Sequence, residues 1–331
     1  MSPLKLTAAL CTRDRPEELR RALASLLVQT EPPDEILVVE NAPRDGRVRE
    51  LIASGFPGVR WTSEPVPGLD FARNRALAAA TGDVVAFLDD DAVADAGWAA
   101  ALRAPFADPR VGAVTGRVEA LATETPGQRL VEANGGYSRG LRRVRLPEEG
   151  SHPLHGRRAP LIAWAVSVGS GCSLAVRRSL LLEIGGFDEA LDLGAELPGG
   201  GDHDALWRVL SAGSSLVYEP AALARHEHRR DLDAAGRQIV GHQRALVAFL
   251  VKSLRHAAGG RRLGILAFLL WRLAKPAVRL VRRAFGRDPL PARLLLRMLA
   301  GCWAGLWAYP AARRTAARRR SLSWSVSPTL S

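Results

Sequence analysis

The chain has 331 residues, of which 47% are apolar and 24% are charged, a composition that excludes a largely disordered protein. This length leaves room for one large domain or two smaller ones. The formal net charge of +12 is unevenly distributed: residues 1–230 carry 27 Lys and Arg against 31 Asp and Glu, and residues 231–331 carry 19 against 3. The three cysteines are far apart and form no metal-ligand pattern, which favours a reducing compartment over a disulfide framework.

Strand and helix patterns alternate through the first 110 residues. Strands are predicted at residues 6–10, 35–39, 59–62 and 84–88, and helices at residues 16–28, 47–53 and 71–80. This alternation predicts an α/β fold in which helices cover both faces of a mostly parallel sheet. In open sheets of this kind, ligands bind beyond the carboxyl ends of the strands.

Polar clusters follow three of the predicted strands. They are residues 11–14, the pair Glu40 and Asn41, and the consecutive carboxylates Asp89, Asp90 and Asp91. Clustered negative charge at the end of a buried strand is costly unless a cation offsets it. Mg²⁺ and Mn²⁺ prefer carboxylate oxygens and leave room for phosphate, so the triplet indicates a metal site for a nucleotide diphosphate. On this pattern alone, a solvated turn or a helix N-cap is an equal alternative, and it remains the interpretation for Asp90.

The middle of the chain is less regular. Residues 122–160 predict long loops, which would suit a mobile lid over a substrate. Residues 166–176 predict a strand interrupted by glycines, where the backbone either approaches a ligand or forms a bulge. A glycine-rich segment at residues 198–201 precedes a predicted helix that ends at Ser211.

Seven short segments occur in the order found in the family 2 glycosyltransferases. They are Thr12-Arg13-Asp14-Arg15-Pro16, Val38-Val39-Glu40-Asn41, Ala72-Arg73-Asn74, Thr81-Gly82-Asp83 with the acidic triplet, Gly185-Gly186-Phe187-Asp188-Glu189, Gly200-Gly201-Asp202-His203-Asp204, and Glu219-Pro220 with His226. Each segment alone is weakly specific, but together they cover residues 4–230. The chain therefore resembles this inverting family, which implies a Rossmann-like GT-A domain at residues 1–230.

The resemblance implies a site for a nucleotide-diphosphate sugar donor. The residues that would bind the donor are Thr12, Arg13, Glu40, Arg73 and Asp89. A divalent metal ion, Mn²⁺ or Mg²⁺, would be held by Asp91 and by His226, for which His228 is a rival. The family more often has Asp at the position of Glu40. The alternative role for Arg73 is a surface ion pair with Asp70 or Asp83, which would contribute little.

Asp202 aligns with the general base of the family. In an inverting transfer, such a carboxylate accepts the proton of the acceptor hydroxyl while that oxygen attacks the anomeric carbon. Many members have Glu-Asp here, whereas this chain has Gly201 before Asp202, and Asp204 is the alternative base. Gly171 and Cys172 are expected to pack on the acceptor side. A helix N-cap is a compatible structural role for Asp202.

Residues 231–312 predict an apolar, helical region with basic residues at intervals. The cations that would share one helix face are Arg272, Lys275, Arg279, Arg282 and Arg283. The aromatic residues that would suit the headgroup level of a bilayer are Trp271, Trp303, Trp307 and Tyr309. We therefore expect a basic amphipathic region on the membrane surface, peripheral or monotopic, with a solvated helical subdomain as the alternative.

The ends of the chain carry two further expectations. The first residues lack the apolar length of an export signal, which favours the cytoplasmic face of the cell membrane. Residues 313–331 are expected to form a disordered basic tail.

The predicted function is a metal-dependent, inverting glycosyl transfer to a lipid-linked or polysaccharide acceptor. A sugar-nucleotide pyrophosphorylase would share the α/β layout, but residues 11–14 lack the glycines of its loop. A dehydrogenase is disfavoured, because it would need a GxGxxG motif after a strand and no predicted strand is followed by one. A nucleic-acid-binding protein would account for the positive charge, but the basic region is apolar and aromatic in blocks, so no nucleic-acid partner is expected.

Overall fold

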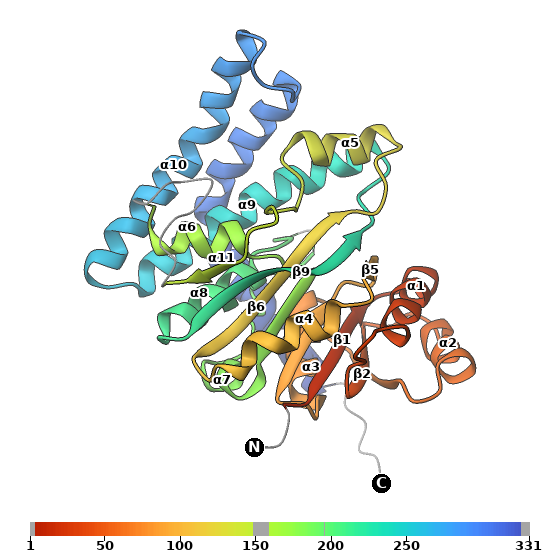
Figure 1. Cartoon of the computed structure of the whole chain (residues 1–331). Helices are drawn as coiled ribbons and strands as arrows, with labels where there is room; N and C mark the ends of the chain where they lie inside the picture. Colours follow the sequence, from red (N-terminus) through yellow and green to blue (C-terminus); the bar gives the residue numbers. More distant parts are fainter. Residues whose placement is uncertain (1–3, 148–158, 195, 326–331) are drawn as a thin grey trace.

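A mixed sheet forms the centre of the molecule in the computed structural model, which describes residues 4–147, 159–194 and 196–325 (Figure 1). Its strands are β1 (Leu6–Thr12), β2 (Glu35–Asn41), β3 (Arg60–Glu64), β4 (Val84–Leu88), β5 (Ala92–Ala94), β6 (Val111–Ala120), β7 (Val144–Leu146), β8 (Ser173–Arg177) and β9 (Ser215–His226). The strand order is β3-β2-β1-β4-β8-β6-β9-β5, and β7 pairs with β9. The four strands predicted from the N-terminal part form the parallel half of this sheet, as expected.

Helices cover both faces of the sheet. They are α1 (Pro16–Leu27), α2 (Arg47–Gly55), α3 (Leu69–Ala79), α4 (Trp98–Arg103), α5 (Pro126–Ala133), α6 (Leu161–Val168), α7 (Arg178–Glu183), α8 (Gly201–Ser211), α9 (Leu232–His256), α10 (Gly259–Ala284) and α11 (Ala292–Ser325), with a short 3₁₀ helix at Ala104–Ala107. Apolar residues of α1, α2 and α4 form the core on one face, and those of α3, α6 and α8 form the core on the other. The predicted α/β fold is therefore confirmed.

The register of β1, β2 and β4 brings three polar strand ends together. Thr12 lies opposite Glu40 in the parallel pair of β1 and β2, and Ala9 lies opposite Phe87 in the pair of β1 and β4. Thr12 therefore reaches the level of the residues that follow Leu88, where the acidic triplet begins. Because the strands are parallel, their carboxyl ends share one edge, which is where the site lies.

The predicted strand at residues 166–176 is wrong in its first part. Residues 166–168 complete α6, whose N-cap is Pro160, and the strand begins only at Ser173. Residues 161–168 are apolar except for Ser167 and are buried almost throughout, and such a run does not distinguish a buried helix from a buried strand.

The expected lid at residues 122–160 contains regular structure. Thr125 and Gln128 form a capping box at the start of α5, and β7 joins the sheet beside β9. The part of the expected lid at residues 148–158 lies outside the described residues.

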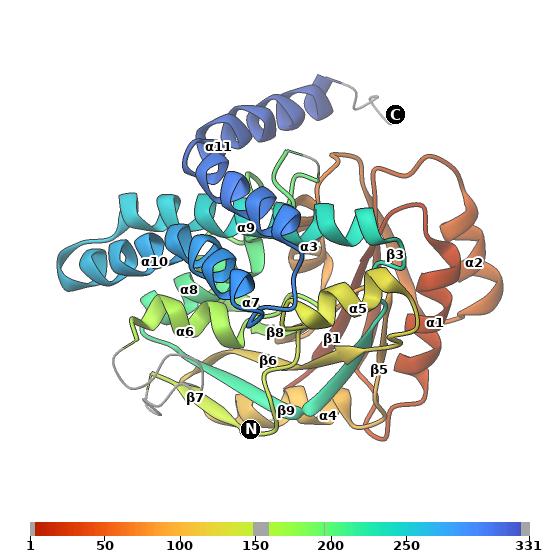
Figure 2. The ribbon, with the colours of Figure 1, turned by 90° about the horizontal axis from the view of Figure 1, so that it is seen from above.

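The C-terminal region is helical, as predicted, and packs on the α/β part of the chain (Figure 2). Residues of α9 and α11 share a core with Phe71 and Leu191, and residues of α9 and α10 share another with Trp207. The prediction of a disordered tail is wrong up to residue 325, because α11 continues to Ser325. Arg319 binds the carbonyl oxygen of Pro67 and lies 2.8 Å from Glu196.

The predicted basic face of α10 does not form a single solvent-facing surface. Arg272 and Lys275 line an internal cavity, and Arg279 forms an ion pair with Asp288 at 2.7 Å. The exposed residues along this helix are largely apolar, and they include Leu263, Leu270, Val278 and Val281. Within the described part of the chain, no helix has both the length and the apolar character needed to cross a membrane.

Candidate active site

One cavity of about 1980 Å³ lies between the carboxyl ends of the strands and the C-terminal helices. The predicted site residues that line it are Thr12, Arg13, Arg73, Asp89, Asp91, Gly171, Cys172, Asp202 and His226. Glu40 and Asp204 are not part of its lining. The structure therefore brings together residues that are separated by more than 200 positions in the sequence.

Asp89, Asp91 and His226 form a cluster that could hold a metal ion. One ligand atom from each of these residues lies within 4.8 Å of the others. His226 reaches the triplet because β9 pairs with β5, which places His226 opposite Ala92. Burial and the charge of Asp91 raise the pKa of Asp89, as expected for carboxylates that are crowded together. Two carboxylates and an imidazole are a suitable donor set for a divalent cation.

Asp90 has a structural role that differs from a solvated turn. It is buried, and its carboxylate accepts a hydrogen bond from the Thr12 hydroxyl at 2.7 Å. Arg15 donates to Asp90 and to Asp91, both at 3.1 Å. The Thr12 side chain is thus engaged with the triplet, and Arg15 offsets part of its negative charge. Arg15 was not among the predicted site residues, although it belongs to the first family segment.

Glu40 is buried at the end of β2, directly before Asn41, which lines the cavity. Its Oε2 accepts a hydrogen bond from the Trp61 indole at 3.1 Å. Its Oε1 has no hydrogen-bond partner among the described residues, and burial raises the pKa of the carboxyl group. A buried acceptor without a partner costs about 1–3 kcal/mol. The arrangement fits a bound group that donates a hydrogen bond to Oε1.

Asp202 lies in the first turn of α8 with its carboxylate fixed by backbone groups. Its Oδ2 accepts a hydrogen bond from the Gly171 N–H, and its Oδ1 accepts one from the His203 N–H, both at 2.8 Å. Burial opposes ionisation, but His203, Arg73 and these N–H groups lower the pKa of Asp202 below its ordinary value. The structure therefore holds an ionised carboxylate in the cavity.

Arg73 is buried among carboxylates instead of forming a surface pair. Its Nη1 lies 3.0 Å from Asp70 and 3.5 Å from Asp192, and Asp192 accepts a hydrogen bond from the Gly201 N–H at 2.9 Å. Asp70 was expected only as a partner of Arg73 in a surface ion pair, and this pair is buried instead. Asp192 was not predicted, because it belongs to no residue pattern that indicates a site. The network links α3 to the start of α8 and hence to the next residue, Asp202.

Two glycines beside this network have no room for a side chain. A Cβ atom on Gly201 would lie 1.8 Å from Asp70 Oδ2, so Asp70 occupies the space beside this position. A Cβ atom on Gly171 would lie 2.6 Å from Arg73 Nη2. This chain has no glutamate at position 201, but the carboxylate of Asp70, on α3, lies beside that position. Cys172 follows Gly171 on the cavity wall, and burial raises the pKa of its thiol, as expected for a packing residue.

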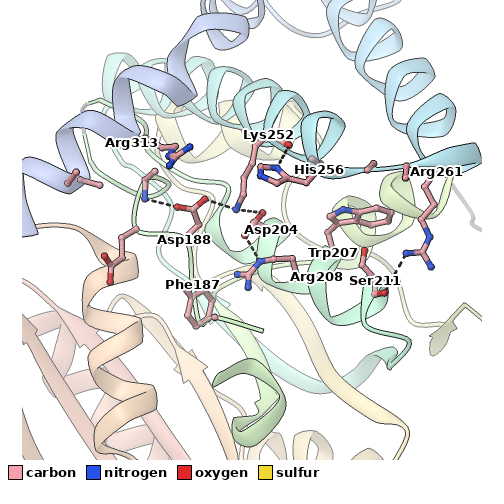
Figure 3. Close-up of a pocket in the computed structure, with 18 of the residues that line it drawn as sticks. Phe187, Asp188, Asp204, Trp207, Arg208, Ser211, Lys252, His256, Arg261 and Arg313 are labelled. Carbon is pink, nitrogen blue, oxygen red and sulfur yellow. Dashed lines mark hydrogen bonds and ion pairs between the residues drawn. The ribbon is translucent and has the colours of Figure 1, made fainter. Parts of the chain in front are cut away.

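Asp204 lies on the other side of α8 and does not join the site. Its carboxylate accepts a hydrogen bond from Arg208 at 2.8 Å and lies 2.6 Å from Lys252. Figure 3 shows Lys252 between Asp204 and Asp188, at a second cavity of about 1000 Å³. Residues two apart on a helix face different directions, so Asp202 and Asp204 cannot both face one cavity. The structure does not support Asp204 as the alternative base.

The His228 side chain contacts the ring of His226. The Nδ1 atoms of the two rings are 3.2 Å apart, and His228 Nε2 lies 2.9 Å from Glu132. The Tyr137 ring packs edge-on against both imidazoles, with centroid distances of 5.5 and 5.2 Å. Tyr137 and Glu132 come from the segment predicted as loops, and no motif in the sequence indicated that they contact the site. Between the two histidines, His226 is the one that joins the acidic cluster.

The sequence matches the family model for glycosyl transferase family 2 over residues 7–185, which is more than half of the chain. The chain belongs to glycosyl transferase family 2. This membership decides among the predicted alternatives in favour of a glycosyltransferase.

Curated relatives of this glycosyltransferase are longer than the chain. A pre-mycofactocin glycosyltransferase of Mycobacterium tuberculosis is 30% identical over 234 residues, which cover 69% of this chain and 43% of the relative. N-acetylgalactosaminyltransferase 6 of Drosophila melanogaster is 27% identical over 64% of this chain and 32% of its own length. The chain thus spans less than half the length of these relatives.

Solved structures share the fold of this glycosyltransferase. A mannosyltransferase from Pyrobaculum calidifontis, in complex with GDP-Man and Mn²⁺, has a TM-score of 0.57 and 21% identity, and the match covers 99% of this chain and 89% of that one. GalNAc-T7, with UDP, GalNAc and Mn²⁺, has a TM-score of 0.53 and 16% identity, covering 88% and 59% respectively. These matches support the GT-A fold.

We expect Arg73→Met to destabilise the glycosyltransferase most at neutral pH. Burial raises the pKa of Asp70 and brings that of Asp192 to about 6, and both rise further without Arg73. A carboxyl group with a higher pKa in the folded state reduces stability as the pH rises from its unfolded towards its folded pKa. The expected loss in the free energy of unfolding is about 3–5 kcal/mol near pH 7.5. Near pH 5 the loss should be smaller.

Urea unfolding of the variant and the wild type at both pH values measures this difference. Arg75→Met on the same helix is the matched control, because Arg75 is exposed. A loss that is equal at the two pH values would show that the carboxylates do not depend on Arg73.

Proposed function

We propose that this chain transfers a sugar from a nucleotide-diphosphate donor to a hydroxyl group with inversion at the anomeric carbon. The observation that supports it most is that one cavity contains both the Asp89, Asp91 and His226 cluster and the ionised carboxylate of Asp202. A metal site and a base that share one cavity are the two requirements of this reaction. The Mn²⁺ and nucleotide ligands of the two structural neighbours agree with the proposal.

In the proposed donor complex, the nucleotide lies against the ends of β1, β2 and β4. Glu40 Oε1 accepts a hydrogen bond from the base or the ribose, because it lacks a partner among the described residues. Arg13 contributes positive charge at the same edge, and Asp89 faces the ribose. Arg73 contributes its charge to the diphosphate region from within its carboxylate network.

Asp91 and His226 hold the proposed divalent cation, Mn²⁺ or Mg²⁺, with Asp89 beside them. When bound, the cation offsets the negative charge that develops on the departing nucleoside diphosphate. The chain itself supplies the orientation of these ligands. His228 fixes the ring of His226, and Arg15 holds Asp91 in place.

Asp202 is the proposed general base. The Gly171 N–H keeps its carboxylate directed into the cavity, and the lowered pKa keeps it ionised before the reaction. The carboxylate accepts the proton of the acceptor hydroxyl as that oxygen forms its bond to the anomeric carbon. Gly171 and Cys172 form the neighbouring wall on the acceptor side.

We further propose that the acceptor is a lipid-linked or polysaccharide glycan and that the chain works at the cytoplasmic face of the membrane. The proposed contact surface consists of exposed apolar residues on α10 and α11. Trp303 and Trp307 are one turn apart on α11, with 57% and 77% of their surfaces exposed. Arg282 and Arg283 near the end of α10 would attract anionic lipid.

Asp202→Asn should lower the rate of transfer by about 10²- to 10⁴-fold, because the amide cannot accept the proton. Nucleotide binding should remain near that of the wild type. The measurement is the release of nucleoside diphosphate from a donor with Mn²⁺ and a supplied hydroxyl acceptor. Asp204→Asn is the comparison: it should reduce stability while the folded fraction keeps its activity. Full activity in Asp202→Asn would overturn the assignment.

Asp91→Asn should remove the part of nucleotide binding that depends on the metal. In a thermal-shift assay, a panel of nucleoside diphosphates with Mn²⁺ should raise the Tm of the wild type, because a ligand that binds only the folded state stabilises it. The variant should lose this rise. Asp95→Asn, which removes an acid at the other end of β5, should retain it. An equal rise in Asp91→Asn and the wild type would contradict the proposed metal site.

Replacing Trp303 and Trp307 together by serine should weaken binding to phosphatidylglycerol vesicles by about 10-fold or more, since two large apolar side chains would no longer enter the lipid. Vesicle co-sedimentation measures this binding. The matched control is the double replacement of Leu27 and Val28 by serine, since both are exposed on a different face, at the end of α1. If both double variants bind like the wild type, α11 does not contact the membrane.

A further inference from the structure

The cavity that contains the catalytic residues also has a strongly basic wall. The cations on this wall come mainly from the C-terminal helices and include Arg229, Arg237, Arg272, Lys275 and Arg297. The proposed donor and metal residues lie at the strand ends and involve none of these five. The basic wall therefore has no role in the function proposed above.

Arg272 and Lys275 are partly buried, whereas Arg229, Arg237 and Arg297 are exposed. Arg272 and Lys275 are one turn apart on α10, and neither has a carboxylate within ion-pair distance in the described part of the chain. Arg272 donates to the side-chain oxygen of the neutral Gln243 at 2.5 Å, and its Nε has no partner among the described residues. The next cation along this face, Arg279, is by contrast paired with Asp288.

The electrostatic surroundings of these two residues are unfavourable for positive charge. Burial and the neighbouring Arg279 lower the pKa of Arg272 to about 10. Burial, Arg272 and Arg279 lower the pKa of Lys275 to about 8. Cations that are enclosed without a counter-charge destabilise the fold, unless an anion binds between them.

The surroundings also indicate the kind of anion. Arginine and lysine together match a phosphate group, which offers several oxygens to a planar guanidinium and to an ammonium group. Apolar side chains of Leu246, Phe268 and Trp271 line the same cavity beside the two cations. Trp271 is 43% exposed, so this wall continues towards the exposed apolar side of α10. The chemistry fits a phosphate that carries a hydrocarbon chain.

We propose that Arg272 and Lys275 form a subsite for the phosphate group of a lipid-linked acceptor. The inference rests on the proposed function, because it assigns the second substrate of that same cavity. It narrows the acceptor to an amphipathic phosphate ester, whose charged group lies on the basic wall and whose hydrocarbon follows the apolar residues. A neutral polysaccharide would leave Arg272 and Lys275 without a counter-charge.

The test measures binding of farnesyl phosphate to the full chain without donor or metal, so that it does not depend on catalysis. Lys275→Met and Arg272→Gln should each weaken binding by about 10-fold or more, the effect of losing a charge-assisted contact. Lys275→Arg should keep most of the affinity. Arg262→Gln is the matched control, because Arg262 is exposed on the same helix, and it should bind like the wild type. If Arg272→Gln fails to fold, the two Lys275 variants decide the result.

Further arms identify the source of the phosphate. Farnesol should bind at least about 10-fold more weakly than farnesyl phosphate, and inorganic phosphate should compete with the latter. Equal binding of farnesol and farnesyl phosphate, or wild-type affinity in Lys275→Met, would overturn the subsite. If Lys275→Met impairs binding only to phosphatidylglycerol vesicles and not to farnesyl phosphate, the cations contact bilayer headgroups and the acceptor assignment is wrong.

Nucleotide binding with Mn²⁺ separates this proposal from the function on which it rests. Lys275→Met should show the same Mn²⁺-dependent thermal shift with nucleoside diphosphates as the wild type. If the wild type binds farnesyl phosphate through Lys275 but shows no such shift, the transferase proposal fails and the phosphate subsite is supported. If the shift is normal and farnesyl phosphate does not bind, the subsite alone is overturned.

Discussion

The buried guanidinium of Arg73 is the interaction on which the arrangement of the site depends. Asp70 and Asp192 flank it at 3.0 and 3.5 Å, and its charge also lowers the pKa of Asp202. Without this cation, three carboxylates would share a small buried volume, and at least one would take up a proton. The same network fixes the backbone at Gly201 and therefore the first turn of α8. One arginine thus links the position of the proposed base to its ionisation.

Negative charge at the end of β4 is balanced by a different set of groups. Arg15 and Thr12 bind Asp90, and His226 Nε2 lies 3.2 Å from Asp91 Oδ1. The protein thus compensates part of the charge of the triplet and leaves Asp89 with a raised pKa. A site that was fully neutralised by its own side chains would have little affinity for a cation. The incomplete compensation is consistent with a metal site that also accepts phosphate.

The sequence predicted the parallel half of the sheet well, because each strand is a buried apolar run bounded by turn residues and helices. It also predicted that Asp91, His226 and Asp202 share a site, through segments whose order matches a family. It could not predict Asp192 or Tyr137, or that the pair of Arg73 with Asp70 is buried, because these features arise only from tertiary contacts across the cavity. Asp204 was misplaced for a related reason: the pattern placed both acids on one helix but did not show that they face opposite sides of it.

The C-terminal helices show why a basic, apolar sequence does not determine its own orientation. A helix that lies on lipid and a helix that borders an anion-binding cavity both need cations on one face and apolar residues on the other. The contacts show how this helix is oriented: Ile265 and Phe268 pack into a core with Trp207, and Arg272 and Lys275 line the cavity. The apolar residues that remain, Leu263 and Leu270 among them, are exposed. The proposed lipid contact on the outer face of this helix and the proposed phosphate subsite on its inner face are therefore compatible with each other.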